Sequence, residues 1–314
     1  MKKLKIGTWM AAGLLVVVGP AFAETATTQG QGQAVVTVLP KGNREEPVKI
    51  LQQDLQVKVN GKASDVTGWV PLRGANDALD LVVLIDDGAR SSIGNQIDDI
   101  ASFIKSLPAN VRVGVGYMEN GRAAMAGPLS TDHAEVASQL RLPSGIEGTN
   151  GSPYFCLSEL AQHWPSTDRA SRHEVVLITD GVDNYYRQFD PDDPYVLAAI
   201  HDSARAGLVV YSIYWTDRGF GDDSMYMSDA GQNLLSEVTE ATGGTSYWNG
   251  MGNPVTFQPY FEDISRRLRN QYRLSFSSGL SGKAEVKSMG LKVGGPASKV
   301  YAPRQVFVTH PEAE

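Results

Sequence analysis

A nearly continuous apolar run at residues 79–85, LDLVVLI, is the feature that most restricts the fold of this chain. A strand with one face in a core alternates apolar and polar residues, whereas a strand covered on both faces is apolar at most positions. Comparable runs follow at residues 111–117, 174–179 and 208–215. Between them the spacing of apolar residues predicts helices, for example Ile93 to Leu107 ended by Pro108. We therefore expect an α/β protein with a mostly parallel, Rossmann-like central sheet, helices on both of its faces, and small β additions at both ends.

The ends of the chain differ in composition from its middle. Residues 1–23 combine three early lysines, an apolar run at 6–18 and Ala21-Phe22-Ala23, which predicts a cleaved signal peptide and export to the periplasm or medium. A membrane anchor is the alternative, but the apolar run is shorter than the ~20 residues that span a bilayer. We expect a disordered lead-in at 24–33, an N-terminal β arm at 34–78, the main domain at 79–270 and a C-terminal β extension at 271–314.

Charge and cysteine content limit the partners and the means of stabilisation. The chain has 28 basic and 35 acidic residues, a net charge of −7, which argues against nucleic acid or an anionic membrane as a partner. The single cysteine, Cys156, excludes a disulfide framework. Its apolar neighbours favour a buried structural thiol over a catalytic one.

Three polar segments follow predicted strands, where ligands of such sheets bind. They are Asp86-Asp87-Gly88-Ala89-Arg90, the loop around Thr149, and Thr179-Asp180-Gly181. Their order resembles the metal-ion-dependent adhesion site of von Willebrand factor A (VWA) domains, which has an Asp-x-Ser-x-Ser pattern, a later Thr and a Thr-Asp-Gly turn. The resemblance implies a VWA-like fold over residues 79–270 and a divalent cation near Asp86, Thr149 and Asp180.

A narrower resemblance rests on other segments. Asp54-Leu55 to Asn60-Gly61, SPYFCLSEL, IYW and TGGTSYW are similar to the VWFA-related domain proteins of acidobacterial type. That family is exported and places a β arm before its VWA part, and its function is poorly defined.

The motif departs from the adhesion site at two positions. Gly88 and Arg90 stand where the pattern has serines. Glycine offers no side-chain oxygen and arginine carries a permanent positive charge, whereas Mg²⁺ needs about six oxygen ligands. We therefore expect a degenerate site without an obligatory metal, in which Arg90 neutralises Asp86, Asp87 or Asp180 or else points to solvent. The alternative is a rearranged site for Mg²⁺, Mn²⁺ or Ca²⁺ that recruits Asp87, Ser91 or Ser92.

The same edge of the sheet is the expected contact surface, because tyrosine is common at binding hot spots and Tyr185-Tyr186 closely follow the Asp180 turn. The expected binding residues are Asp86, Asp87, Gly88, Arg90, Thr149, Ser152, Asp180, Asp183, Tyr185 and Tyr186. Residues 217–227 are an expected mobile rim. The carboxylates between 183 and 193 suggest a solvated acidic loop, with a Ca²⁺ loop as the alternative.

Known catalytic patterns are missing from the sequence. There is no Gly-x-Gly-x-x-Gly after Ile85, no Gly-x-x-x-x-Gly-Lys-Ser/Thr, no Gly-x-Ser-x-Gly and no His-Glu-x-x-His. We therefore predict an exported, adhesion-like module that binds an unidentified protein and is not an enzyme. A cation-dependent ligand-binding domain is the first alternative, and a hydrolase or phosphotransferase built on the same sheet is the second.

Overall fold

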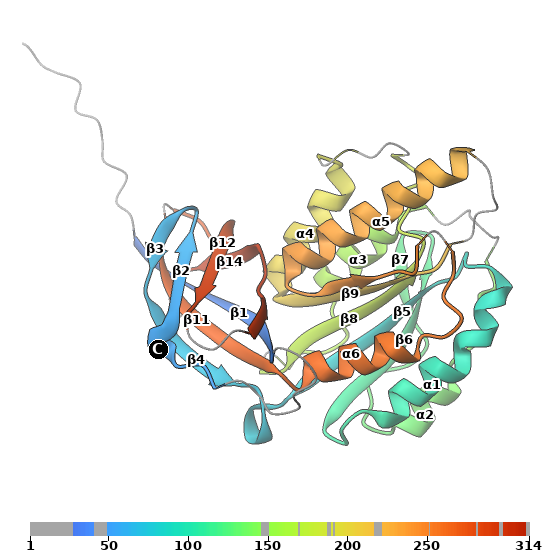
Figure 1. The fold of residues 1–314 in the computed structure, drawn as a ribbon, viewed down its shortest axis with the longest axis horizontal. Helices are drawn as coiled ribbons and strands as arrows, with labels where there is room; N and C mark the ends of the chain where they lie inside the picture. Colours follow the sequence, from blue (N-terminus) through green and yellow to red (C-terminus); the bar gives the residue numbers. More distant parts are fainter. Residues whose placement is uncertain are drawn as a thin grey trace, which may run out of the picture.

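The computed structural model describes residues 28–40, 49–145, 151–168, 170–186, 190, 192–216, 222–250, 252–280, 282–294 and 298–311. The chain forms two lobes, an α/β lobe from its middle and a β lobe from both of its ends (Figure 1). The predicted signal peptide at 1–23 lies outside the described residues. None of the described helices is both long and apolar enough to cross a membrane.

The α/β lobe contains a six-stranded sheet in the order β10-β9-β8-β5-β6-β7. Its first four pairings along this order are parallel, and the β6–β7 pairing at the edge is antiparallel, so the sheet is mixed. The predicted α/β class is confirmed. The strands are β5 (Leu79–Asp86), β6 (Val111–Glu119), β7 (Arg122–Met125), β8 (Arg172–Thr179), β9 (Leu208–Tyr214) and β10 (Thr245–Tyr247).

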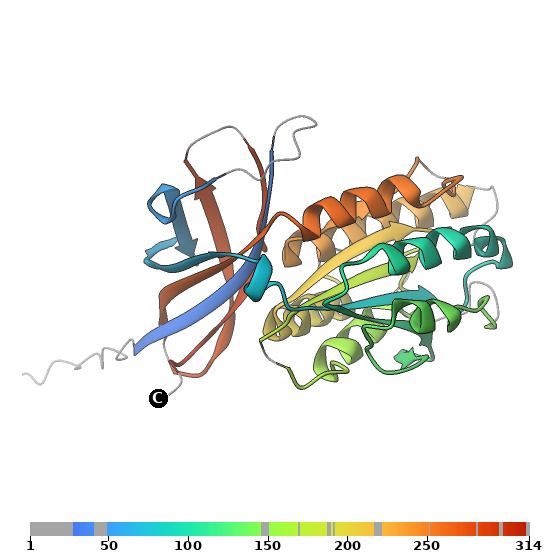
Figure 2. The same cartoon turned by 90° about the horizontal axis from the view of Figure 1, so that it is seen from below.

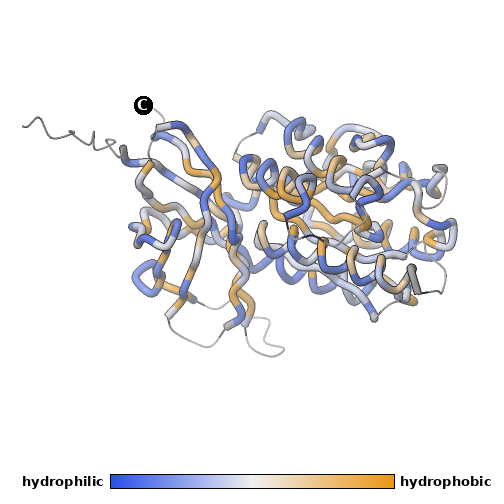
Figure 3. Tube along the Cα trace, turned by 90° about the horizontal axis from the view of Figure 1, so that it is seen from above, coloured by the Kyte–Doolittle hydropathy of each residue, from blue (hydrophilic) through white to orange (hydrophobic). Residues whose placement is uncertain are grey.

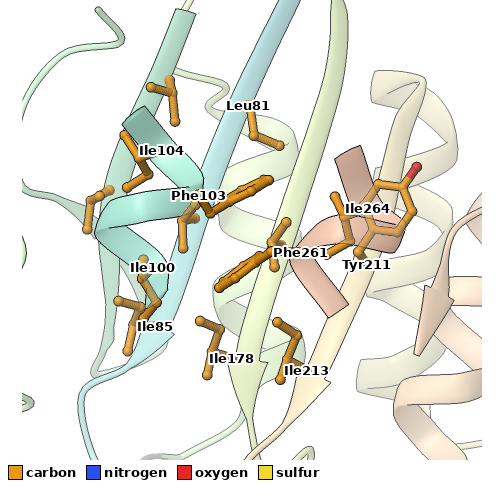
Figure 4. Packing of buried hydrophobic residues seen from close by; sticks show 14 of the residues in the cluster. Leu81, Ile85, Ile100, Phe103, Ile104, Ile178, Tyr211, Ile213, Phe261 and Ile264 are labelled. Atoms are coloured by element: carbon orange, nitrogen blue, oxygen red, sulfur yellow. The ribbon is translucent and has the colours of Figure 1, made fainter. Parts of the chain in front are cut away.

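Helices cover both faces of this sheet because alternate residues of β5 point in opposite directions. Leu81, Val83 and Ile85 join one core with α1, α2 and α6, whereas Val82 and Leu84 join another with α3, α4 and α5. Figure 4 shows Phe103 of α1 stacked on Phe261 of α6, with ring centroids 4.4 Å apart. The helices are α1 (Ile97–Ser106), α2 (His133–Ser138), α3 (Pro153–Gln162), α4 (Pro194–Ala206), α5 (Asp222–Thr242) and α6 (Gln258–Leu268).

The β lobe is one eight-stranded antiparallel sheet, not two small additions. Its order is β3-β2-β12-β14-β1-β11-β4, with β13 also pairing with β1. Only Asp65 separates β3 from β4, yet the two strands stand at opposite ends of this order, so the sheet curls round an apolar core. The strands are β1 (Thr28–Pro40), β2 (Leu55–Val59), β3 (Lys62–Ser64), β4 (Val66–Pro71), β11 (Gln271–Leu280), β12 (Glu285–Val293), β13 (Ser298–Tyr301) and β14 (Gln305–Thr309).

The predicted disordered lead-in is wrong for residues 28–33, which begin strand β1 and pair with β11 from Thr28↔Leu280 onward. The reason is a contact distant in sequence. A Cβ added at Gly32 would lie 2.4 Å from the ring of Phe276, so the glycine leaves the space that this ring fills. A segment whose composition indicates disorder is therefore ordered by its partner strand.

The lobes join at the end of the α/β sheet opposite to its carboxyl ends (Figure 2). Gln271 donates a hydrogen bond to the hydroxyl of Tyr211 (3.3 Å), and the backbone N–H of Arg304 donates to the carbonyl of Ala241 (3.0 Å). Apolar residues line the strands inside each lobe, and polar residues lie on the outer helical surfaces (Figure 3). Three short 3₁₀ helices complete the described elements: η1 (Gln52–Asp54), η2 (Gly74–Asn76) and η3 (Ser91–Gln96). The carboxyl ends of the parallel strands therefore face away from the β lobe.

Candidate functional site

The ends of β5 and β8 bring Asp86 and Thr179 together, as the parallel register of Ile85 with Ile178 requires. Asp86 is 5% exposed. Its Oδ1 accepts a hydrogen bond from the N–H of Gly88 (2.9 Å), and its Oδ2 accepts one from the hydroxyl of Thr179 (2.8 Å). In the following turn, Oδ1 of Asp180 accepts from the N–H of Val182 (2.9 Å). The predicted strand-end residues are thus neighbours, and protein donors engage both oxygens of Asp86.

Asp87 is also 5% exposed and is neutralised by Arg141. Nη1 of Arg141 donates to Oδ1 at 2.5 Å, and the N–H and hydroxyl of Ser144 donate to Oδ1 and Oδ2, each at 3.1 Å. Burial raises the pKa of the Asp87 carboxyl, but the hydrogen bonds from Arg141 and Ser144 and the charge of Arg141 outweigh it, so the pKa lies below its ordinary value. Asp87 is therefore an anion held by its own chain.

Arg141 is fixed by contacts on both sides. Its guanidinium lies 3.7 Å from the ring centroid of Tyr117 and donates to Glu119 (2.8 Å). Its backbone N–H donates to the Tyr117 hydroxyl (2.7 Å). At Asp87 the cation is Arg141, and the expectation that Arg90 neutralises Asp86, Asp87 or Asp180 or else points to solvent stays a prediction. Sequence reasoning missed Arg141 because 54 residues separate it from Asp87.

Ser152 and Asp183 form a second buried pair. The hydroxyl of Ser152 donates a hydrogen bond to Oδ2 of Asp183 (3.0 Å). It also accepts one from the N–H of Tyr154, so Ser152 caps the start of α3. Oδ1 of Asp183 accepts from the N–H groups of Tyr185 (2.8 Å) and Tyr186 (3.2 Å). Asp183 is 1% exposed, so its assignment to a solvated acidic loop is wrong: it organises the turn from inside.

Burial raises the pKa of the Asp183 carboxyl. The hydrogen bond from the N–H of Tyr185 and the one from Ser152 act in the opposite direction, and the charge of Asp193 raises the pKa further. Asp193 is itself fully buried at the start of α4, where its Oδ1 accepts from the N–H of Tyr195 (2.8 Å). The loop after β8 thus carries buried negative charge.

Tyr185 is the most exposed of the predicted binding residues described by the structure. It is 64% exposed, and a Cβ at Gly151 would lie 2.4 Å from its ring. Tyr186 is half-buried and donates its hydroxyl to Asp190 (3.1 Å). Thr149, the third residue of the implied metal set, lies outside the described residues, as does the 217–221 part of the expected rim.

Several exposed apolar side chains lie in the segments at this end of the α/β lobe. Among the described residues, eight large hydrophobic side chains are exposed. Six of them lie in the loops and helix starts at the carboxyl ends of the α/β strands, or in segments joined to those loops. We call these six the carboxyl-edge surface: Leu142, Tyr185, Met225, Tyr226, Trp248 and Val255. Gln96 of η3 holds the segment of Val255 through a hydrogen bond to its carbonyl (3.0 Å). Trp248, which follows β10, is 44% exposed.

The described residues of the segment that resembles the adhesion-site motif do not fit a divalent cation of the implied type. Gly88 has no side-chain oxygen, Arg90 is cationic, and both oxygens of Asp86 accept hydrogen bonds from the protein. Within the described ranges, no group of three or more His, Cys, Asp or Glu side chains is arranged to hold a metal ion.

No protein-family model and no curated protein sequence matches this chain. Among solved structures, the chain is similar to the conserved hypothetical protein BatB from Bacteroides thetaiotaomicron, at 13% identity and a TM-score of 0.44 over 60% of this chain and 97% of that one. It is also similar to proximal thread matrix protein 1 from the mussel byssus with a zinc-occupied MIDAS motif, at 14% identity and a TM-score of 0.45 over 67% of this chain and 49% of that one.

A third similar structure is the pilus adhesin SpaC from Lactobacillus rhamnosus GG, at 10% identity and a TM-score of 0.45 over 87% of this chain and 48% of that one. The chain spans about half the length of the mussel protein and of the adhesin. With every TM-score below 0.5, these likenesses decide neither the family nor the function. The α/β class therefore rests on the strands and helices of this chain itself.

Proposed function

We propose that this chain is an exported, adhesion-like module that binds another protein through the carboxyl-edge surface. The observation that carries the proposal is the exposure of Leu142, Tyr185, Met225, Tyr226, Trp248 and Val255 in segments at one end of the α/β lobe. Single exposed apolar residues are ordinary, whereas a gathering of them marks an interaction site. Tyrosine and tryptophan are also the side chains that most often dominate binding energy.

A rigid base supports this use of the surface. The Asp86–Thr179, Asp87–Arg141 and Ser152–Asp183 contacts hold the loops that carry Leu142 and Tyr185. Loops already held in place lose less conformational entropy on binding, which leaves more of the contact energy for affinity. The buried polar groups beneath the surface thus support binding without contacting the partner.

We propose that binding needs no metal and that the module is not an enzyme. Arg141 already neutralises Asp87, and the N–H of Gly88 and the hydroxyl of Thr179 already donate hydrogen bonds to Asp86. No described observation favours the cation-dependent alternative or a hydrolase or phosphotransferase. The partner is a protein, with neither nucleic acid nor an anionic membrane favoured by the acidic surface.

Site-specific photocrosslinking in the native cells tests the proposal. A benzophenone amino acid replaces Tyr185 or Trp248 on the carboxyl-edge surface, and Leu51 or Val70 on the β lobe as controls. Trp248, Leu51 and Val70 are 44%, 46% and 40% exposed, so accessibility is matched. We expect a discrete protein adduct from the two edge positions and not from the controls, unchanged by EDTA.

Two results would contradict this expectation. Equal adducts from edge and control positions, or no adduct from Tyr185 and Trp248, would remove the carboxyl-edge surface as a binding site. Loss of the adduct in EDTA, restored by Mg²⁺, would instead support the cation-dependent alternative.

A further inference from the structure

A groove of about 530 Å³ lies between α1 and α6 on one helical face of the α/β lobe. All of its lining residues belong to these two helices or directly follow α6, and all are in the described part of the chain. Pockets that bind ligands usually enclose about 300–1,000 Å³. The α1–α6 groove therefore has the size of a binding site.

Short side chains on both helices leave this space open. Phe103 of α1 and Phe261 of α6 stack at 4.4 Å between ring centroids and are 3% and 4% exposed, so they close the floor of the groove (Figure 4). The walls above them include three serines, Ser102 and Ser106 on α1 and Ser265 on α6. Longer side chains at these positions would fill the groove.

One end of the groove meets the carboxyl-edge surface. Asp99 lines the groove, and its Oδ2 accepts hydrogen bonds from the hydroxyl of Thr256 (2.5 Å) and the N–H of Phe257 (2.8 Å). Thr256 directly follows the exposed Val255, whose carbonyl accepts a hydrogen bond from Gln96 (3.0 Å). A partner seated on Val255 therefore lies beside the groove.

The two ends of the groove carry opposite charges. Asp99 and Glu262 are acids in the first halves of α1 and α6, whereas the exposed Arg269 directly follows the end of α6. Seven residues of rise separate Glu262 from Arg269, about 10 Å at 1.5 Å per residue. An extended chain covers that distance in about three residues at 3.3 Å each. A base and an acid spaced by three residues would therefore match both ends.

The lining chemistry favours a peptide over other ligands. Seven of the nine lining residues are polar, which disfavours a lipid tail, and two carboxylates against one arginine disfavour a polyanion. Serine hydroxyls and the amide of Gln258 can both donate and accept hydrogen bonds. They match the free N–H and C=O groups of an extended backbone, whereas a helix uses these groups internally.

We infer that the protein partner lays an extended segment in the α1–α6 groove, with a basic side chain toward Asp99 and Glu262 and an acidic side chain toward Arg269. This inference rests on the proposed function, since the groove adjoins Val255 of the carboxyl-edge surface. Charge complementarity at the two ends fixes the direction in which the segment lies.

Photocrosslinking of the full chain in the native cells, with mass spectrometry of the adducts, is the first test. A benzophenone amino acid replaces Gln258 or Ser106, which line the groove, or Ala198 of α4 as a control; all three positions are exposed. We expect both groove positions to capture the protein that Trp248 captures, within one short segment. The base of that segment should lie nearer to Gln258 and its acid nearer to Ser106, and Ala198 should capture nothing.

Charge exchange in the purified chain is the second test. A fluorescent peptide with the captured sequence, and a second peptide with its base and acid exchanged, are compared by fluorescence anisotropy. The variant Glu262→Lys/Arg269→Glu reverses both ends at unchanged net charge. Asp98→Lys/Lys105→Glu is the matched control, because it reverses an exposed acid and an exposed base of α1 that do not line the groove.

We expect the exchanged peptide to bind the unaltered chain about tenfold more weakly than the captured sequence, and the reversed variant to prefer the exchanged peptide. The control variant should bind the captured sequence within about twofold of the unaltered chain. Equal binding of the two peptides to the unaltered chain overturns the inference without any variant, and so does a control that weakens binding as much as the reversal.

The crosslinks separate this inference from the proposed function. An adduct from Trp248 without one from Gln258 and Ser106 overturns the groove and leaves the carboxyl-edge surface. No adduct from Tyr185 and Trp248 overturns the carboxyl-edge surface, and with it the partner segment inferred for the groove.

Discussion

Replacing Arg141 by Met should destabilise the α/β lobe by removing the cation that neutralises Asp87. The change deletes a charge-assisted hydrogen bond, which contributes about 1.5–3 kcal/mol, and a cation–π contact with Tyr117, which contributes about 0.5–1 kcal/mol. Arg141 has a side chain 39% exposed to solvent, which weakens both contributions, and Ser144 still donates to Asp87. We expect a loss of about 2 kcal/mol at neutral pH and a fall of roughly 5 °C in Tm.

The loss should depend on pH in a stated direction. The folded pKa of Asp87 lies below its unfolded value of 3.8, so its contribution to stability is present above pH 3.8 and is lost as pH falls through the folded pKa. Once protonated, Asp87 no longer needs a cation. Urea unfolding of both proteins should therefore show the gap between them narrowing below pH 3.8.

A double-mutant cycle with Asp87→Asn separates this pair from general packing. Asn keeps the shape of the side chain and removes its charge, so Arg141→Met should cost less in the Asp87→Asn background, by about 1 kcal/mol or more. A gap between Arg141→Met and the unaltered chain that stays constant down to pH 3, or additive effects in the cycle, would refute the reasoning.

Three further predictions follow from contacts described above. Thr179→Val should cost about 1–2 kcal/mol by leaving Oδ2 of Asp86 short of a donor, measured by urea unfolding; a neutral effect would show that this hydrogen bond contributes nothing. Gly32→Ala should cost about 1–3 kcal/mol because its Cβ meets Phe276, and Phe276→Leu should relieve part of the cost; an equal cost in both backgrounds would contradict the contact. Excess Mg²⁺, Mn²⁺ or Ca²⁺ should leave the Tm of the unaltered chain unchanged, whereas a bound cation at 100 times its Kd would raise the free energy of unfolding by about 2.7 kcal/mol. The variant Gly88→Ser/Arg90→Ser should make Tm respond to Mg²⁺. If the Tm of this variant does not respond, positions 88 and 90 do not correspond to the motif serines.

The parts of the fold that follow from local pattern could be predicted. The apolar run at 79–85 became β5, whose every residue is buried, because a strand covered on both faces leaves its signature in consecutive residues. The helix expected from Ile93 to Leu107 begins as η3 and continues as α1, with Ile100 and Ile104 buried. Asp86 and Asp180 were placed at the same edge because parallel strands end together.

The parts that depend on distant contacts could not be predicted in this way. Composition indicates disorder for 24–33, and only the fit of Gly32 against Phe276 shows why its second half is a strand. No local pattern connects Arg141 to Asp87, since the arginine follows a short helix and reaches its partner through the fold. Burial of Asp183 likewise depends on Ser152, which comes from the start of another helix.

Asp87 and Asp183 differ in the groups that hold them. The motif resemblance places an external cation near Asp86, Thr149 and Asp180, whereas Arg141 pairs with the neighbouring Asp87 within the chain. Asp183 and Asp193 have equally low exposure, but their described donors are neutral N–H and hydroxyl groups, so Arg141→Met should remove the cation from Asp87 and leave the hydrogen bonds of Asp183 and Asp193 unchanged.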